Sequence, residues 1–304
     1  NYNQTGGTLT QTGTTVSTIN LNGISKSYSQ TGGTVTNTYI NYAVNNAAAI
    51  YSINSDLDIS ASRSSNVNTD TRILGTSLIT GAGTFTLANV TTATLGIGHA
   101  DGIVTVAGGL FGNVRTAVRT FGATANYQYA STAANTGNGF VAANTVSFTN
   151  ATIDLTTSAV ISGTTGALQL TGSLLSLGSN NFTLNNAAAT ITGATLDASN
   201  MVITNGSGQF FRAIPASAWS NPYLWPIGTT TEYNPVRMSF TAAVAGTIGV
   251  KVVDAVHPSM GVAVDNLNVY WDFTSTGLTT YTLSSFELNY NDAQVSGSEA
   301  GLFG

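Results

Sequence analysis

The chain has 304 residues, a net charge of −5, no cysteine and only 7% charged residues, and it is dominated by 49 threonines, 33 glycines and 30 asparagines. This composition excludes a coiled coil, a charge-driven disordered tail and a basic nucleic-acid-binding surface. It also excludes disulfides and thiol nucleophiles, and no apolar run reaches the roughly 18 residues of a membrane-spanning helix. We therefore expect neither a nucleic-acid partner nor a membrane span.

The first element in chain order is an internal repeat. The segment from Tyr2 to Thr10 (YNQTGGTLT) recurs as Tyr28 to Thr36 (YSQTGGTVT), at an offset of 26 residues. A period of this size matches one turn of a β-helix, in which each strand pairs with the strands of the turns above and below it, about 4.8 Å away.

The middle of the chain reads as a succession of short strands. Between Val146 and Gln209, apolar residues alternate with Thr, Ser or Asn in short segments separated by Gly, Asn and Ser. Thr, Val, Ile and Asn gain from stacking in register, whereas stacked charges would repel one another. For residues 1–214 we predict an all-β fold, a parallel β-helix (β-solenoid), with about eight or nine turns of about 22 to 26 residues.

Residues 215–304 differ in composition and are predicted to form a second domain. All five prolines and all three tryptophans lie after residue 214, and so do seven of the 13 acidic residues but only two of the eight basic ones. Clean alternation in Thr247 to Val256 and in Leu267 to Phe273 indicates longer antiparallel strands. These features predict a C-terminal antiparallel β-sandwich at one end of the solenoid.

Several segments together resemble a known family. They are GTFTLANVTTATLGIGHADGI from Gly83, TFGATANYQY, TGNGF, TNGSGQFFR, WPIG, YNPV and VYWDF. In this order they resemble the large repetitive surface proteins secreted by Bacteroidota, over about 220 residues. The resemblance implies an extracellular, cell-surface part of a longer molecule, exported through the type IX secretion system and acting as an adhesin. It does not imply a ligand.

Candidate catalytic and metal-binding residues are few. A glycosidase needs two or three converging carboxylates, and in the first 214 residues only Asp56 and Asp58 are close together; we interpret them as solvated strand residues. His99 and Asp101 lie in a glycine-rich segment that we interpret as a turn between strands. No cofactor is predicted. The acids after Asp254 leave structural calcium open, although no EF-hand spacing is present.

Two groups of residues are candidates for contacts. Residues 1–25 carry no charged side chain and lack the Lys or Pro that usually protects an edge strand, so this stretch is either the first turn of the solenoid or a strand that pairs with a neighbouring subunit. The aromatic residues of the second group either stack on a sugar ring or form the seam between the two domains, which we favour. The inter-subunit candidates are Thr8, Leu9, Thr10, Val16 and Ile19, and the aromatic candidates are Trp219, Tyr223, Trp225 and Tyr233.

The leading functional hypothesis is a non-enzymatic, extracellular structural or adhesive rod that associates with itself, with glycans or with surfaces, and that can assemble into filaments. The alternative is a polysaccharide-binding or polysaccharide-degrading β-helix module. Ice binding is a third class, because flat threonine arrays on β-solenoids can serve it. The Thr-x-Thr matches at Thr8 to Thr10 and Thr34 to Thr36 do not continue along the chain, which disfavours that class.

Overall fold

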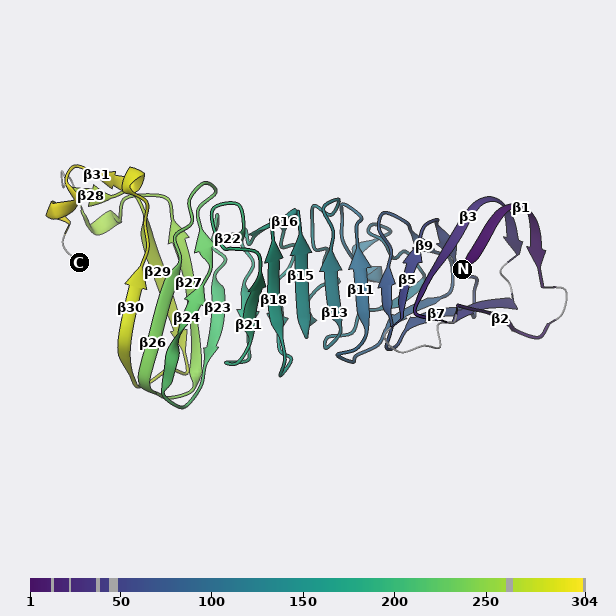
Figure 1. Ribbon diagram of the computed structural model, residues 1–304, viewed down its shortest axis with the longest axis horizontal. Coiled ribbons are helices and arrows are strands. Elements are labelled where there is room, and N and C mark those ends of the chain that lie inside the picture. The colour runs from purple at the N-terminus through teal and green to yellow at the C-terminus, as the bar shows by residue number, and fades with distance from the viewer. Residues whose placement is uncertain (12–13, 22, 37–38, 44–48, 261–264, 303–304) are drawn as a thin grey trace.

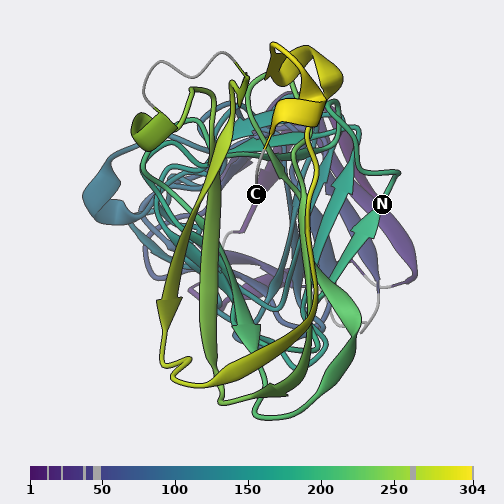
Figure 2. The same ribbon diagram turned by 90° about the vertical axis from the view of Figure 1, so that its left-hand side faces the viewer.

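A computed structural model describes residues 1–11, 14–21, 23–36, 39–43, 49–260 and 265–302, with the side chains of residues 36, 219–221, 242 and 243 left out. It shows an elongated all-β rod (Figure 1). The predicted parallel β-solenoid is confirmed, with about 9 turns, and antiparallel sheets follow it at the C-terminal end. The coil has three faces, and its turns place strands on two or all three of them, so that the chain winds around the long axis of the rod (Figure 2).

The first face is one continuous parallel sheet of nine strands. In spatial order these are β1 (Tyr2–Thr10), β3 (Ser25–Thr36), β5 (Ile50–Ile53), β8 (Thr71–Ile73), β11 (Thr94–Ile97), β13 (Asn126–Tyr129), β15 (Thr145–Thr149), β18 (Ala167–Thr171) and β21 (Thr190–Gly193). The strand order follows the chain order, so each turn of the coil adds one strand to this sheet.

The other two faces are made of shorter sheets. The second face contains β6 (Leu57–Asp58) and β9 (Ile79–Thr80), and further along it β16 (Thr152–Asp154), β19 (Leu174–Ser176), β22 (Met201–Ile203) and β25 (Ile227–Gly228). The third face begins with β2 (Ser17–Asn20), β4 (Ile40–Ala43), β7 (Ser64–Val67), β10 (Thr84–Leu87) and β12 (Val118–Thr120). It continues with β14 (Ala142–Ala143), β17 (Ala159–Ile161), β20 (Phe182–Leu184) and β23 (Phe210–Ile214), which β27 (Gly246–Val253) and β29 (Tyr270–Thr276) extend.

The sequence repeat stacks upon itself. β1 and β3 pair in parallel with Tyr2 opposite Tyr28, and the two phenol rings stack with their centroids 5.1 Å apart. Each tyrosine hydroxyl donates to the glutamine two residues further on, Tyr2 to Gln4 at 2.6 Å and Tyr28 to Gln30 at 2.8 Å. The 26-residue offset is therefore one turn of the coil, as the repeat predicted.

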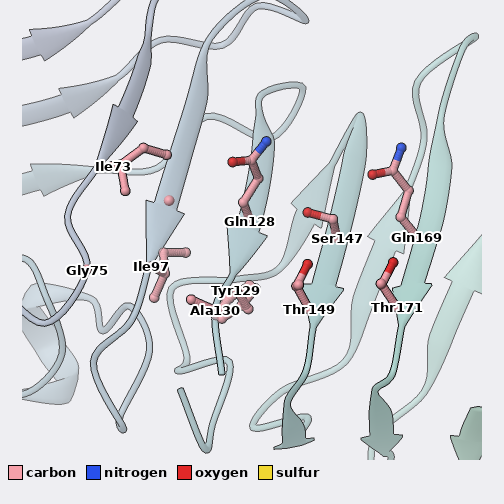
Figure 3. Close-up of a pocket in the computed structure, with 11 residues that line it drawn as sticks. Ile73, Gly75, Ile97, Gln128, Tyr129, Ala130, Ser147, Thr149, Gln169 and Thr171 are labelled. Carbon is pink, nitrogen blue, oxygen red and sulfur yellow. The ribbon is translucent and has the colours of Figure 1, made fainter. Parts of the chain in front are cut away.

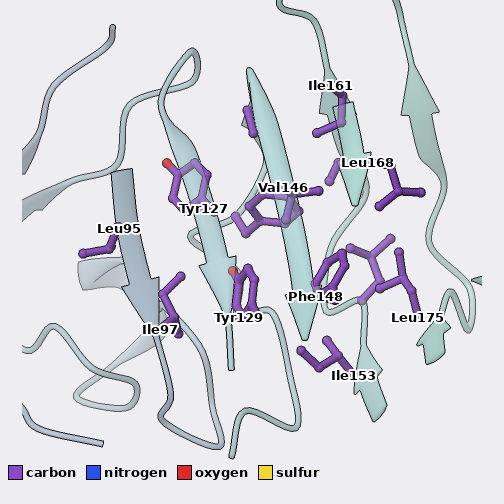
Figure 4. Close-up of a cluster of buried hydrophobic side chains, with 14 of the residues drawn as sticks. Leu95, Ile97, Tyr127, Tyr129, Val146, Phe148, Ile153, Ile161, Leu168 and Leu175 are labelled. Atoms are coloured by element: carbon purple, nitrogen blue, oxygen red, sulfur yellow. The ribbon is translucent and has the colours of Figure 1, made fainter. Parts of the chain in front are cut away.

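The core consists of inward-facing residues stacked from turn to turn. On the nine-stranded sheet, Tyr129 of β13 and Phe148 of β15 lie opposite each other with ring centroids 5.3 Å apart (Figure 4). Both side chains are 1% exposed. Along each of the two strands, every second residue is buried in this way and the residues that alternate with them point outward. This period-two pattern is the one that the sequence alternation indicated.

Antiparallel sheets close the C-terminal end. β27 pairs antiparallel with both β23 and β29, and a separate sheet contains β24 (Trp219–Trp225), β26 (Val236–Ala243) and β30 (Tyr281–Leu288). The two sheets face each other, as two contacts between them show. Trp225 Nε1 of β24 donates to the carbonyl of Ile248 in β27 at 3.2 Å, and the ring centroids of Phe273 and Phe286 are 5.8 Å apart. A small pair, β28 (Asn266–Leu267) with β31 (Val295–Ser296), and the short helices η3 (Pro258–Met260), η4 (Asp292–Gln294) and η5 (Glu299–Gly301) complete this end.

The hydrogen-bonded sheets run across residue 214. β25 lies in parallel beside β22, and β23 joins the last turn of the solenoid to β27. Arg212 of β23, 6% exposed, ties this junction together by donating to the carbonyls of Ala189 at 2.8 Å and Leu224 at 2.9 Å. The boundary between residues 214 and 215 stays a prediction, but backbone pairing is continuous there.

Candidate functional site

The outer face of the nine-stranded sheet carries a row of uncharged polar side chains. Gln128 of β13, Ser147 of β15 and Gln169 of β18 are direct register partners, one on each turn. They occupy outward positions because their neighbours along each strand are buried in the core. Thr149 and Thr171 form a second outward pair on the same strands. Amide and hydroxyl groups therefore recur along the rod axis at the rung spacing of about 4.8 Å.

A shallow hollow of about 380 Å³ lies on this face (Figure 3). The row of Gln128, Ser147 and Gln169 lines it together with Ile73 of β8, two strands away from β13, and none of its lining residues is charged. Gly96 lies between Ile73 and Gln128 in the ladder and has no side chain, and a Cβ there would come within 2.6 Å of Ile73 Cδ1. The hollow thus exists because a glycine interrupts the row of side chains.

Asp56 and Asp58 bind the next turn rather than forming an open acidic pair. Asp56 Oδ1 accepts from the backbone N–H of Leu78 at 2.9 Å, and Asp58 Oδ1 accepts from the hydroxyl of Thr80 at 3.2 Å. Within the described ranges, no three acidic or histidine side chains are grouped as a metal site would require. These contacts give both carboxylates a role in joining successive turns.

The acids near the C-terminus are held separately. Asp265 Oδ1 accepts from the backbone N–H of Ser298 at 2.6 Å, whereas Glu299 accepts from the hydroxyl of Tyr290 at 2.7 Å. Asp272 forms a partly exposed ion pair with Lys251 at 3.5 Å. The structure does not bring these carboxylates to one point.

His99 and Asp101 lie at the start of an excursion from the coil. The backbone N–H of Asp101 donates to His99 Nδ1 at 3.1 Å, and Arg115 Nη2 lies 3.0 Å from His99 Nε2. The histidine is therefore held between the turn backbone and an arginine. The predicted turn is more elaborate than a simple connection between strands, because the chain leaves the coil after Ile103 and returns at Gly112.

The predicted aromatic group lies mostly in the packing between the C-terminal sheets. Tyr223 and Trp225 are 2% and 0% exposed, which leaves no open ring face for a sugar. Arg212 lies 5.0 Å from the centroid of the Tyr223 ring, in the junction described above. Tyr233 is half-buried, and Trp219 pairs through its backbone with Phe240, its side chain being outside the described part.

The N-terminal candidates are paired within the chain on one side. Thr8, Leu9 and Thr10 lie in β1 opposite residues 34–36 of β3, and Ile19 lies in β2 opposite Tyr42 of β4. Val16 precedes β2 and is 40% exposed. Among the described residues, β1 and β2 have no strand on their outer edges. The described residues therefore place this segment in the first turn of the coil, and the pairing of Thr8, Leu9, Thr10, Val16 and Ile19 with a neighbouring subunit stays a prediction.

No family model matches the chain, and comparisons with curated proteins and solved structures found no match either. None of the described helices is long and apolar enough to cross a membrane.

The outward row of Gln128, Ser147 and Gln169 was not identified from the sequence, although the alternation of their strands was visible. Their alignment depends on the lengths of the intervening turns, which the sequence pattern did not define.

Proposed function

We propose that the protein is a non-enzymatic, extracellular rod with a structural and adhesive role. The observation that carries this proposal is the continuous nine-stranded parallel sheet, whose outer face presents neutral amides and hydroxyls in register. A ladder of backbone hydrogen bonds along the axis stiffens the rod, and each turn repeats similar surface chemistry. Such a surface suits repeated weak contacts with an extended, uncharged, hydroxyl-rich partner such as a polysaccharide.

The placement outside the cell rests on the resemblance to secreted Bacteroidota surface proteins. Adhesion is favoured over catalysis because Asp56 and Asp58 are engaged with the next turn. Self-association into filaments stays part of the proposal, and its basis is the uncharged β-strand pattern of residues 1–25, which lacks the Lys or Pro that usually protects an edge strand.

Beads coated with the protein are expected to stay on an insoluble neutral polysaccharide such as cellulose when salt is raised to about 1 M, where the screening length falls to about 3 Å. The reason is that no charged residue lines the hollow on the sheet face. Bead retention under flow is the measurement. Release of the beads by salt would contradict an adhesive face made of neutral groups.

The same assay assigns the contact to the sheet face. Replacing Gln128 and Gln169 together by alanine should lower retention about tenfold, which corresponds to two hydrogen bonds of about 0.5–1.5 kcal/mol each. The double variant Thr152→Ala/Thr183→Ala removes two polar groups from the outer sides of the other two faces and should leave retention unchanged. Equal losses in the two variants would contradict the assignment.

A further inference from the structure

One turn of the solenoid contains an inserted hairpin. Residues 103 and 112 form an antiparallel bridge, while Val114 pairs in parallel with Ile79 of the preceding turn. On the other side, the backbone N–H of Ile103 donates to the carbonyl of Thr136 in the following turn at 3.1 Å. Residues 104–111 therefore project from the second face, and they include η2 (Val106–Gly108), the blue turn at the side of the rod in Figure 2.

The base of this projection is held by polar side chains. Arg119, only 9% exposed, donates to the carbonyls of Thr105, at 2.7 Å, and Gly109. Asn138 Oδ1 accepts from the backbone N–H of Thr105 at 2.9 Å, and Arg115 Nε donates to the carbonyl of Gly112 at 3.0 Å. Burial is the main reason that the pKa of Arg119 is lowered. The buried guanidinium of Arg119 therefore fixes the conformation of the loop by binding two of its carbonyl groups.

A hollow of about 250 Å³ lies between the projection and the following turn. Its apolar side consists of Phe111, which is 61% exposed, and Val104. Its polar side consists of Asp101, Asn135, Asn138 and Thr156. The hollow is smaller than the roughly 300 Å³ at which drug-sized pockets begin, so it suits one small ring.

The polar side offers both donors and acceptors. Asn138 uses Oδ1 for Thr105, which leaves Nδ2 as a donor, and Asn135 uses Nδ2 for the carbonyl of Ala100 at 3.3 Å, which leaves Oδ1 as an acceptor. Within the described ranges these two remaining atoms have no hydrogen-bond partner. Thr156 Oγ1 accepts from the backbone N–H of Gly137 at 3.1 Å and keeps its own proton for donation.

The charge in the hollow selects against ionic ligands. Among the described residues that line it, Asp101 alone is charged, so an anion would be repelled. A cation is disfavoured as well, because the Arg115 guanidinium lies 3.0 Å from His99 Nε2 and places a positive charge close to this end of the hollow. A neutral molecule with one apolar face and several hydroxyl groups on its rim fits an aromatic ring flanked by amides, a hydroxyl and a carboxylate.

We propose that this hollow binds one neutral hexose residue of a glycan, with its C–H face on Phe111 and its hydroxyls on Asp101, Asn135 and Asn138. The inference rests on the proposed adhesive role and gives it a discrete sugar-binding site, separate from the nine-stranded sheet face. Binding by a single small ring is expected to be weak, with a Kd of about 1 mM.

The test is saturation-transfer NMR on the full chain with cellobiose, lactose and maltose as probes. At least one of them should receive magnetisation from the protein, whereas glucuronic acid and choline should receive less. Phe111→Ser should weaken the response about tenfold, since it removes the ring. Asn138→Asp retains the acceptor for Thr105 but replaces the free donor by a carboxylate oxygen, so it should also weaken the response.

Leu110→Ser is the matched control, because Leu110 is 69% exposed on the same loop and does not line the hollow. It should leave the response unchanged. No response to any neutral disaccharide, a stronger response to choline or glucuronic acid, or an equal loss in Leu110→Ser would overturn the sugar site. If bead retention on cellulose persists in Phe111→Ser while the disaccharides show no response, the sugar site is wrong and the adhesive sheet face stands.

Discussion

Replacing Asp70 by alanine is expected to lower the free energy of unfolding by about 3–5 kcal/mol, because the change leaves a buried guanidinium without its counter-ion. Asp70 and Arg72 are 1% and 2% exposed. Asp70 Oδ2 accepts from Arg72 Nη2 at 3.1 Å and from Nε at 3.3 Å. The guanidinium also donates to Ser65 Oγ at 3.2 Å and to the carbonyl of Asn66 at 3.1 Å, so it cannot turn toward water without breaking these bonds.

Urea unfolding followed by circular dichroism measures the effect. Asp272→Ala is the control, since Asp272 also pairs with a cation, Lys251, but its side chain is 51% exposed. An exposed pair contributes about 0–1 kcal/mol, so this variant should unfold close to the parent. If the two variants lose the same stability, the burial of the Asp70–Arg72 pair has no energetic consequence and the prediction is wrong.

Raising the pH above about 10 should destabilise the fold steeply, because many tyrosines are buried in a neutral state. Burial raises the pKa of Tyr28 to about 12 and that of Tyr223 to about 12, and it raises the pKa of Tyr127 and Tyr129 as well. Each of these shifts means that ionising the phenol costs more free energy in the folded chain than in the unfolded chain. The stabilisation is complete below the unfolded pKa of about 10 and is lost as the pH rises through the folded pKa.

Arg212 has the opposite effect on stability in the same pH range. Its pKa is lowered by burial to about 10, so the cost of burying its charge disappears as the pH rises, but it is one group against several tyrosines. The measurements are the urea midpoint at increasing pH and the tyrosinate absorbance of the native protein. Tyr127→Phe should flatten the pH dependence, whereas Tyr281→Phe, at a position 52% exposed, should not change it. A midpoint that stays constant up to about pH 12 would refute this expectation.

The solenoid could be predicted from the sequence because its signal is local and repeated. The pairing of Tyr2 with Tyr28 follows from the repeat, and the alternation around Tyr127 and Val146 marks the inward positions. The inward position of Arg72 could not be predicted, since only the fold brings Asp70, Ser65 and Asn66 around its guanidinium. A charged residue in a strand pattern otherwise indicates an outward position.

The remaining features depend on contacts between distant segments. The change of composition after residue 214 indicated different strands, but not that β27 would continue the solenoid sheet by pairing antiparallel with β23. The segment GIGHADGI indicated a turn, and the hairpin beyond it depends on the side chains of Arg119 and Asn138, the latter from the following turn. The sequence around Phe111 therefore indicates a glycine-rich turn but not the proposed sugar-binding hollow, which forms only when the following turn packs beside it.

The direction of the hydrogen bonds in the nine-stranded sheet also decides how the rod would respond to force. These bonds lie along the long axis, and each turn is joined to the next by only a few of them. Tension applied to the two ends would be carried in full by every interface between turns, so the weakest interface would open first and the others would follow one by one. A load pressing sideways would instead be shared among many turns, so a tether of this kind would lengthen stepwise under pulling and resist bending.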